Sequence, residues 1–264
     1  MEKISYDMIR LLILCGGLMV FLLLETILPY RESSVSKLKR WLNNIGLGVV
    51  NTVILQLLFT TMMVGVAAHS STQQSGLLHF FNVPRWLKVL DTIVTMDLLL
   101  FLGHVLLHRL PLLWRIHRVH HTDLNVDVST SLRRHLFEVV LSAMARTAGY
   151  YFLGADPVGV LIFELFYLLS DQIRHTSLRL PWGLERLLWL LFVPPGMHRV
   201  HHSVDTEERH TNFGRCFSVW DRLFGTMRTG VYQERIWYGV DGHIQEKKLD
   251  IQHLLAMPFL PPVK

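Results

Sequence analysis

The sequence has few cysteines and lacks several motifs that mark common kinds of site. Cys15 and Cys216 are the only cysteines, and Cys15 lies inside an apolar run, so no disulfide framework is expected. An HExxH motif is absent, which excludes the zinc proteases that depend on it. GxGxxG, P-loop and CxxC motifs are absent as well, so the sequence predicts no flavin, nucleotide or iron–sulfur module of its own.

Charge is scarce and unevenly distributed. Charged residues make up 18% of the chain and apolar residues 50%, which excludes a disordered chain or an acidic solvating tail. The net charge of +5 does not come from one aromatic-interleaved basic patch, so nucleic acid is not a predicted partner. The apolar residues instead concentrate in long runs.

Two of these runs are long enough to cross a membrane. Leu11–Leu28 has 18 residues with one charge, Glu25, and Ile45–Ala68 has 24 residues with none. At 1.5 Å per residue, each can span a hydrocarbon core of about 30 Å. The first run has a flank of mixed charge and no small-residue cleavage site, so we interpret it as a retained anchor rather than a signal peptide.

Further apolar segments follow. Val89–Leu107 is a third candidate span, and Leu136–Leu153 and Val158–Ser170 form a pair separated by the helix break Gly154-Ala155-Asp156-Pro157. The pair is either a full crossing or a re-entrant hairpin. We therefore expect an all-α integral membrane protein with about four transmembrane helices and a cytoplasmic histidine-rich helical cap. The alternative is a soluble protein with two buried helices.

The basic residues predict the orientation and the domain organisation. Counting crossings places four groups of them on one side: Arg31, Lys37, Lys39 and Arg40; Arg109, Arg115 and Arg118; Arg133 and Arg134; and Arg174, Arg179, Arg186 and Arg199. The opposite loop has only Arg85 and Lys88, so the richer side is expected to be cytoplasmic. We expect an anchor with two transmembrane helices in residues 1–88, a catalytic histidine-rich region in residues 89–230, and a cytoplasmic tail in residues 231–264.

The chain contains 15 histidines, and eight of them form three short motifs. They are His104-x-x-x-His108, His117-x-x-His120-His121 and His198-x-x-His201-His202. At the chain's own histidine frequency, HxxHH should occur about 0.05 times, and it occurs twice. On a helix, positions i, i+3 and i+4 share a face, so each motif is expected to point all its imidazoles the same way.

Such convergence is typical of a metal site. Eight or more imidazoles suit two ions, and imidazole accepts zinc, copper, iron or nickel. A site beside a bilayer suggests a lipid substrate. Oxidation of an unactivated C–H bond in a lipid needs O₂ chemistry, which favours iron.

The sequence resembles the fatty acid hydroxylase superfamily, also called the sterol desaturase family, of integral-membrane di-iron enzymes. The resemblance covers about Asp97 to Thr226 and agrees in the order, spacing and linkers of its motifs. The segments that carry it are Asp97–His121, Arg134–Glu138, His175–Pro181, Pro194–Ser203, Asn212–Gly214 and Trp220–Thr226.

The resemblance implies that two iron ions are bound on the cytoplasmic face, with zinc as an adventitious replacement. Carried over by position, the ligands and catalytic residues are His104, His108, His117, His120, His121, His175, His198, His201 and His202. Some members have a further histidine where this chain has Asp171. Either Asp171 contributes an oxygen ligand to the metal site, or His135 fills the gap, or the site has one ligand fewer.

Three polar residues are weaker candidates. Asp97 lies two helical turns before His104, so it either orients a ligand imidazole or makes a polar helix contact. Glu138 has the same two interpretations. Asn212 either lines the mouth of the site or caps a turn before Gly214.

The resemblance implies an O₂-dependent oxidoreductase that hydroxylates or desaturates a membrane lipid such as a sterol, a sphingolipid or a fatty acyl chain. A separate electron donor is expected, either cytochrome b5-like, a ferredoxin or a reductase. The expected location is the bacterial inner membrane or the endoplasmic reticulum. Two other classes compete with this prediction: a membrane metal transporter or metal-binding protein, and a catalytically inactive relative of the family.

Overall fold

The computed structural model describes all residues except 1–5, 59, 241–242, 244, 247–248 and 261–264. Helices make up its regular structure, and the described part of the chain contains isolated β-bridges but no strand. The prediction of an all-α protein is therefore confirmed.

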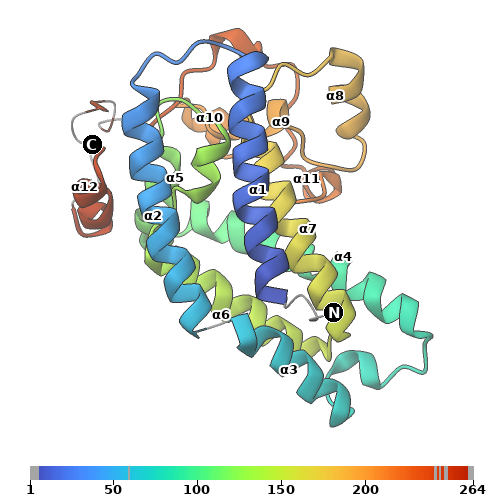
Figure 1. Cartoon of the computed structure of the whole chain (residues 1–264). Coiled ribbons are helices and arrows are strands. Elements are labelled where there is room, and N and C mark those ends of the chain that lie inside the picture. The colour runs from blue at the N-terminus through green and yellow to red at the C-terminus, as the bar shows by residue number, and fades with distance from the viewer. Residues whose placement is uncertain (1–5, 59, 241–242, 244, 247–248, 261–264) are drawn as a thin grey trace.

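Six helices form the body of the molecule: α1 (Tyr6–Ile27), α2 (Lys37–Leu58), α3 (Thr60–Thr72), α4 (Arg85–Arg109), α6 (Leu136–Leu153) and α7 (Pro157–His175). The shorter elements are η1 (Leu77–His79), α5 (Pro111–His121), η2 (Val128–Leu132), α8 (Trp182–Leu188), α9 (Pro195–His201), α10 (Thr206–Arg209), α11 (Val219–Leu223), η3 (Gln233–Arg235), α12 (Ile251–Ala256) and η5 (Met257–Phe259). Figure 1 shows α5, α9 and α10 at one end of the long helices and α3 at the other.

Helix α7 is the central helix. It packs against α1, α3, α4, η2 and α9. The main core lies where α3, α4, α6 and α7 meet and includes the fully buried Tyr150, Val160 and Phe163. Burying an aromatic side chain of this size contributes about 1.5–3 kcal/mol. The core therefore fixes the N-terminal half of α7, the helix whose last residue is His175.

Two described helices are long and apolar enough to cross a membrane. They are α1 over Met8–Ile27 and α4 over Arg85–Arg109, which correspond to the first and third predicted runs. In α1 only 6% of the apolar window is buried inside the molecule, so its apolar side chains face outward. The second predicted run, Ile45–Ala68, lies in α2 and α3, on either side of residue 59, which lies outside the described residues. A crossing over this run stays a prediction.

The predicted break between α6 and α7 is present and is built from small and capping residues. Gly154 ends α6 with φ of 68°, a conformation that suits glycine. Gly76 lies so close that a Cβ placed on it would fall 2.3 Å from the Gly154 nitrogen. Asp156 caps α7 by accepting from the amides of Val158 and Gly159, and its Oδ2 lies 2.8 Å from Nε of Arg85. The turn is thereby tied to the start of α4.

At the other end of the bundle, buried charges hold α2 against α5 and η2. Arg40 Nε donates to Asp123 Oδ1 at 2.5 Å, and Arg40 NH1 donates to Asp127 Oδ2 at 2.7 Å. Arg133 donates to Asn44 Oδ1 at 3.0 Å and to the Val119 carbonyl at 3.1 Å. These bonds fix the segment that follows the His117 motif.

Glu25, the carboxylate in the first apolar run, also joins separate segments at this end of the bundle. Glu25 Oε1 accepts from the amides of Val128 at 2.9 Å and Ser177 at 2.7 Å. It therefore joins the end of α1 to η2 and to the segment after α7. An acid in a predicted span is explained by the backbone amides that it satisfies.

We predict that Asp156→Ala lowers the free energy of unfolding by about 1 kcal/mol, because α7 loses its N-cap. Asp156→Asn keeps the cap and loses only the ionic contact with Arg85. Partial burial raises the pKa of Asp156, but the hydrogen bonds from Arg85 and the capping amides outweigh it, so the pKa lies below its ordinary value. This contribution is present above the unfolded pKa of about 3.9 and is lost as the pH falls through the folded pKa.

The check is thermal unfolding in detergent as a function of pH. Wild type should exceed Asp156→Asn in stability at pH 7, and the difference should shrink below about pH 4. Glu207→Gln, which removes a highly exposed carboxylate, serves as the control. A difference that grows as the pH falls would contradict the assignment.

Candidate metal centre

Four helix segments deliver the clustered histidines. His104 and His108 lie in the last turns of α4, and His175 is the last residue of α7. The two HxxHH motifs lie on α5 and across the end of α9. Proline begins both of these short helices, at Pro111 and Pro195, where its missing N–H costs no hydrogen bond.

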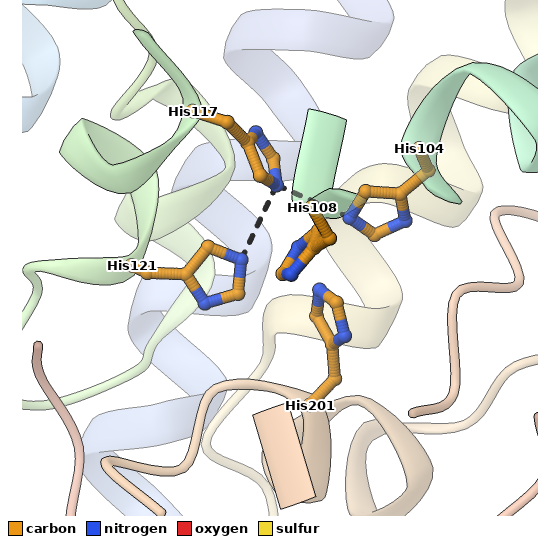
Figure 2. A group of neighbouring side chains, drawn as sticks. All are labelled: His104, His108, His117, His121 and His201. Atoms are coloured by element: carbon orange, nitrogen blue, oxygen red, sulfur yellow. Dashed lines mark hydrogen bonds between the residues drawn. The ribbon is translucent and has the colours of Figure 1, made fainter. Parts of the chain in front are cut away.

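The imidazoles separate into two compact groups, and within each group the nearest ligand atoms all lie within 4.8 Å of one another. The five-histidine group, drawn in Figure 2, consists of His104, His108, His117, His121 and His201. The four-histidine group consists of His120, His175, His198 and His202. Together they contain the nine histidines that the resemblance implied.

Each HxxHH motif contributes to both groups. On α5 the i and i+4 residues, His117 and His121, join the five-histidine group, and His120 at i+3 joins the other. The second motif is reversed, since His201 joins the five-histidine group. The expectation that all imidazoles of a motif point one way was therefore wrong, because positions i+3 and i+4 differ by about 100° around a helix.

Backbone carbonyls fix the tautomers of four clustered histidines. His104 Nδ1 lies 2.8 Å from the Phe213 carbonyl, and His201 Nδ1 lies 2.8 Å from the Thr211 carbonyl. In the four-histidine group, His120 Nδ1 lies 3.1 Å from the Arg133 carbonyl and His175 Nδ1 lies 2.6 Å from the Asp171 carbonyl. A carbonyl can only accept, so each Nδ1 carries the proton and each Nε2 presents a lone pair.

Several of these lone pairs face one another. His120 Nε2 and His175 Nε2 are 3.1 Å apart, and His104 Nε2 and His117 Nε2 are 3.2 Å apart. His117 Nδ1 lies 3.1 Å from Glu138 Oε2, which favours a proton on Nδ1 and a lone pair on Nε2 there too. Two neutral imidazoles cannot hydrogen bond through two lone pairs, whereas a cation between them satisfies both.

Buried nitrogens without partners give the same indication. Among the described residues, both ring nitrogens of His108 and Nε2 of His201 have no hydrogen-bond partner, although both side chains are buried. Unsatisfied buried polar atoms are costly and rare, and they are expected where an ion binds. The side chains present therefore fit metal ions with nitrogen ligands.

Burial also keeps the imidazoles in the form that binds metal. It lowers the pKa of His202 to about 3, and the nearby His117 adds to the shift. Burial likewise lowers the pKa of His121 and of His201. These imidazoles are neutral at pH 7 and have free lone pairs for a metal.

Two residues predicted as metal ligands lie outside both groups. His135 caps α6, since its Nδ1 accepts from the Phe137 amide and its Nε2 donates to the Leu255 carbonyl at 3.2 Å. The Asp171 carboxylate is paired with Arg174 and lies 2.6 Å from Arg134. Asp171 still serves the site, because its carbonyl accepts from His175.

The weaker candidates have different roles. Asp97 does not contact an imidazole: it accepts from the amides of Cys216 and Phe217, each at 3.0 Å, and from the Trp220 indole at 2.9 Å. It therefore holds the loop whose Phe213 carbonyl orients His104. Glu138 is the one of the three that lies against a clustered imidazole.

Asn212 is a turn residue. Its φ is 55°, its amide donates to the Met197 and Arg228 carbonyls at 3.2 Å, and its Oδ1 accepts from the Arg228 amide at 2.9 Å. The turn interpretation is the one that the structure supports.

The sequence analysis did not identify several groups that orient the clustered imidazoles. The carbonyls of Phe213, Thr211 and Arg133 leave no side-chain signal, so no motif could have found them. Asp221 accepts from the amides of Phe213 and Gly214, each at 2.7 Å, and thereby holds the same loop as Asp97. The signal available in the sequence for Asp221 was a carboxylate within a short helix, close to the Asn212–Gly214 turn.

We predict that Asp97→Asn lowers the free energy of unfolding by about 2 kcal/mol, because an amide nitrogen would face N–H donors. A loss of that size lowers Tm by about 5 °C in a chain of this length. Asp91→Asn, on the same helix, is the matched control and should change Tm little. Equal effects of the two substitutions on thermal unfolding in detergent would contradict this role.

Known proteins resemble the chain in the same region. The alkylglycerol monooxygenase of Caenorhabditis elegans is 29% identical over 54% of this chain and 28% of its own length. The ornithine lipid hydroxylase OlsE of Rhizobium tropici is 26% identical over 91% of this chain and 72% of its own. The cholesterol 25-hydroxylase of Rattus norvegicus is 24% identical over 63% and 55%. The chain thus spans about half, or less, of the first and third relatives.

No solved structure gave a significant match. The model of the fatty acid hydroxylase family matches residues 89–226, a region that contains all nine clustered histidines. Because that match covers more than half of the 264 residues, the chain belongs to the fatty acid hydroxylase family.

Proposed function

We propose that this protein is an O₂-dependent di-iron enzyme that hydroxylates a membrane lipid. The observation that carries the proposal is the pair of buried histidine groups with inward-facing lone pairs, found in a chain of this family. Each group would hold one metal ion.

The bound ions would supply the activation of O₂ and the removal of hydrogen from an unactivated C–H bond. The chain's own residues position the ligand rings and keep the site dry. Backbone carbonyls and Glu138 hold the rings so that Nε2 points inward, and burial excludes water from the site. Fixed, dry ligands of this kind reduce the reorganisation needed during reaction.

Hydroxylation is the outcome we favour over desaturation. The motifs themselves do not distinguish the two, because both begin with the same hydrogen abstraction. The three relatives described above are a monooxygenase and two hydroxylases by name. That shared outcome supports insertion of oxygen, although their substrates differ.

The membrane arrangement belongs to the proposal. We propose about four crossings, with α6 and α7 as a crossing or a re-entrant pair, and a metal centre on the cytoplasmic face. The two apolar helices α1 and α4 support a membrane protein. The basic residues gathered at the histidine end, such as Arg40 and Arg109, support that face.

Electrons would come from a separate donor of cytochrome b5, ferredoxin or reductase type. The absence of nucleotide and flavin motifs from the sequence supports this. Residues 89–230 would form the catalytic region.

The test is lipid analysis of cells supplied with isotopically heavy O₂, combined with metal analysis of the purified protein. Wild type should bind iron and produce a lipid that carries one heavy oxygen atom. His201→Ala should lose bound iron and the labelled lipid, because His201 Nε2 is a buried atom without a protein partner. The control His253→Ala removes an exposed histidine paired with Asp250 and should retain both.

Each other result has a distinct meaning. A lipid that loses two hydrogens without gaining label would replace hydroxylation by desaturation. Iron bound by wild type, with no O₂-dependent product in cells given several lipid classes and a donor, would favour a metal-binding or inactive relative. Metal that crosses the membrane in a His201-dependent manner would favour a transporter.

We also predict that Glu138→Gln weakens iron affinity about 10- to 100-fold, because Glu138 Oε2 lies 3.1 Å from His117 Nδ1 and favours its tautomer. Iron titration of the metal-free protein measures this. The exposed Glu32→Gln is the matched control and should bind as wild type does. Unchanged affinity in Glu138→Gln would remove Glu138 from the site.

A further inference from the structure

Two short helices outside the bundle expose a group of large apolar side chains. They belong to α8, to the turn 189–192 that follows it, and to α11, which Figure 1 shows together at one side of the molecule. Six of them, 48–69% exposed, are named here the α8–α11 surface: Trp182, Leu187, Leu190, Leu191, Leu223 and Phe224. A group of large exposed apolar side chains marks a contact with a partner or a membrane.

The parts of the α8–α11 surface are joined to each other and to α4. The Ser218 amide, at the start of α11, donates to the Leu191 carbonyl at 2.9 Å. The ring of Phe224 packs on Phe101 of α4, with 5.3 Å between the ring centroids. The surface therefore has a fixed position relative to the bundle.

Backbone pairing sets the level of α8 relative to α1. The Tyr30 amide donates to the Ser177 carbonyl at 2.7 Å, and the Arg179 amide donates to the Leu28 carbonyl at 3.3 Å. The segment before α8 therefore runs beside the end of α1, whose candidate span is Met8–Ile27. In Figure 1, α8 lies at the height of the C-terminal turns of α1. Where α1 crosses a bilayer, this is the height of the lipid head groups.

The outer face of α4 lies next to the α8–α11 surface. Phe101, which contacts Phe224, is followed by Leu102 and then by Leu106, which are 40% and 48% exposed. Helix α4 is the second described helix that is long and apolar enough to cross a membrane. The apolar side chains of α11 therefore adjoin a face that lipid would cover, so the same bilayer can cover both.

The exposed charges of these segments are positive. The structure describes residues 178–192 and 219–224 in full, and in them Arg179, Arg186 and Arg222 are exposed. The two acids of the same segments, Glu185 and Asp221, are buried. No carboxylate of these two segments would therefore have to enter a layer of lipid head groups and acyl chains, where an unpaired charge is costly.

Trp182 and Arg186 form a pair that is typical of a membrane interface. The Arg186 guanidinium lies 5.7 Å from the centroid of the Trp182 ring. Tryptophan and arginine both have an apolar body and a polar end, so they suit the boundary between acyl chains and water. The exposed acids Glu32 and Glu234 line a hollow together with Trp182, and they bound the surface on the side of η3.

Helix α8 is also joined to a helix that carries clustered histidines. Glu185 Oε1 accepts from the Gly196 amide at 2.6 Å, and Gly196 lies in the first turn of α9. Helix α9 carries His198 and His201. The position of α8 therefore helps to fix where α9 begins, and a membrane contact at α8 would hold the metal centre at a set distance from the lipid.

We propose that the α8–α11 surface is a membrane-interface anchor, which inserts its side chains among the outer parts of the acyl chains without crossing the bilayer. Its partner is a lipid surface, and Arg179, Arg186 and Arg222 reach the head groups. The proposal rests on the membrane arrangement of the proposed function and not on the chemistry of the metal centre. Arg179 and Arg186 are among the basic residues expected on the cytoplasmic side, so the anchor belongs to that side.

The test is fluorescence quenching by lipid, measured on the full chain in nanodiscs that contain one copy each. Cys15→Ser removes the exposed cysteine, and Cys216 is buried. Bimane is attached to Leu187→Cys or to Leu223→Cys, and each protein is placed in phosphatidylcholine with and without bromine on the acyl chains. Bromine quenches a dye that enters the chains, so we expect fluorescence about twofold lower in brominated discs at both positions.

Two further positions serve as controls. Leu23→Cys carries the dye on the exposed face of α1 and should be quenched by brominated lipid. Glu207→Cys carries it on α10, where the side chain is 83% exposed, and brominated lipid should leave it unchanged. Iodide dissolved in the water should quench the Glu207 position more strongly than Leu187 or Leu223.

Other results would overturn the anchor. Quenching of the Leu187 and Leu223 labels by iodide, with none by brominated lipid, would place the surface in water. Lipid quenching that is present with one copy in each disc and lost with two copies would assign the surface to a second copy of the chain. A Leu23 label that lipid does not quench would overturn the crossing by α1 and the anchor with it.

The same labels separate the anchor from the proposed enzyme function, because the measurement needs neither iron nor O₂. Labels at Leu187 and Leu223 that lipid quenches, in a protein that binds no iron or forms no lipid product, would support the anchor and refute the enzyme function alone.

Discussion

The fold is organised around one electrostatic constraint: neutral imidazoles are buried with their lone pairs turned toward each other. The pair His120 and His175, with Nε2 atoms 3.1 Å apart, cannot be satisfied by hydrogen bonding once both Nδ1 atoms are committed to carbonyls. Three buried carboxylates that do not contact the imidazoles support this arrangement. Glu25, Asp97 and Asp221 each accept from two or more backbone or indole donors, and they thereby fix the segments that carry the carbonyls.

Much of the site could be predicted from the sequence, because histidine spacing at i, i+3 and i+4 reflects helix geometry directly. The nine histidines of the two groups were all identified this way, with the family resemblance supplying His175. Their division into two groups was not predicted, since a shared helix face conceals a difference of about 100° between neighbouring positions. Only the packing of four separate helices determines which side each ring faces.

Two further features depend on long-range contacts that the sequence does not reveal. Asp97 has the right spacing to support His104, but the donors that it meets come from residues 216–220, far away in the sequence. The uncharged run Ile45–Ala68 has the composition of one span, and its described residues lie in α2 and α3. Composition records which residues can lie in lipid, but the path of the chain depends on tertiary contacts such as those of α3 with α6 and α7.

The reversed use of the two HxxHH motifs has a consequence for how the centre assembles. Helix α5 contributes two rings to one group and one to the other, and the α9 motif does the opposite, so neither group can form without both segments. The two metal sites would therefore be filled interdependently. Binding of the first ion orders both segments, so binding of the second ion no longer costs the conformational entropy of ordering them. The protein would then pass between empty and doubly loaded forms, with little of the singly loaded form that could react with O₂ unproductively.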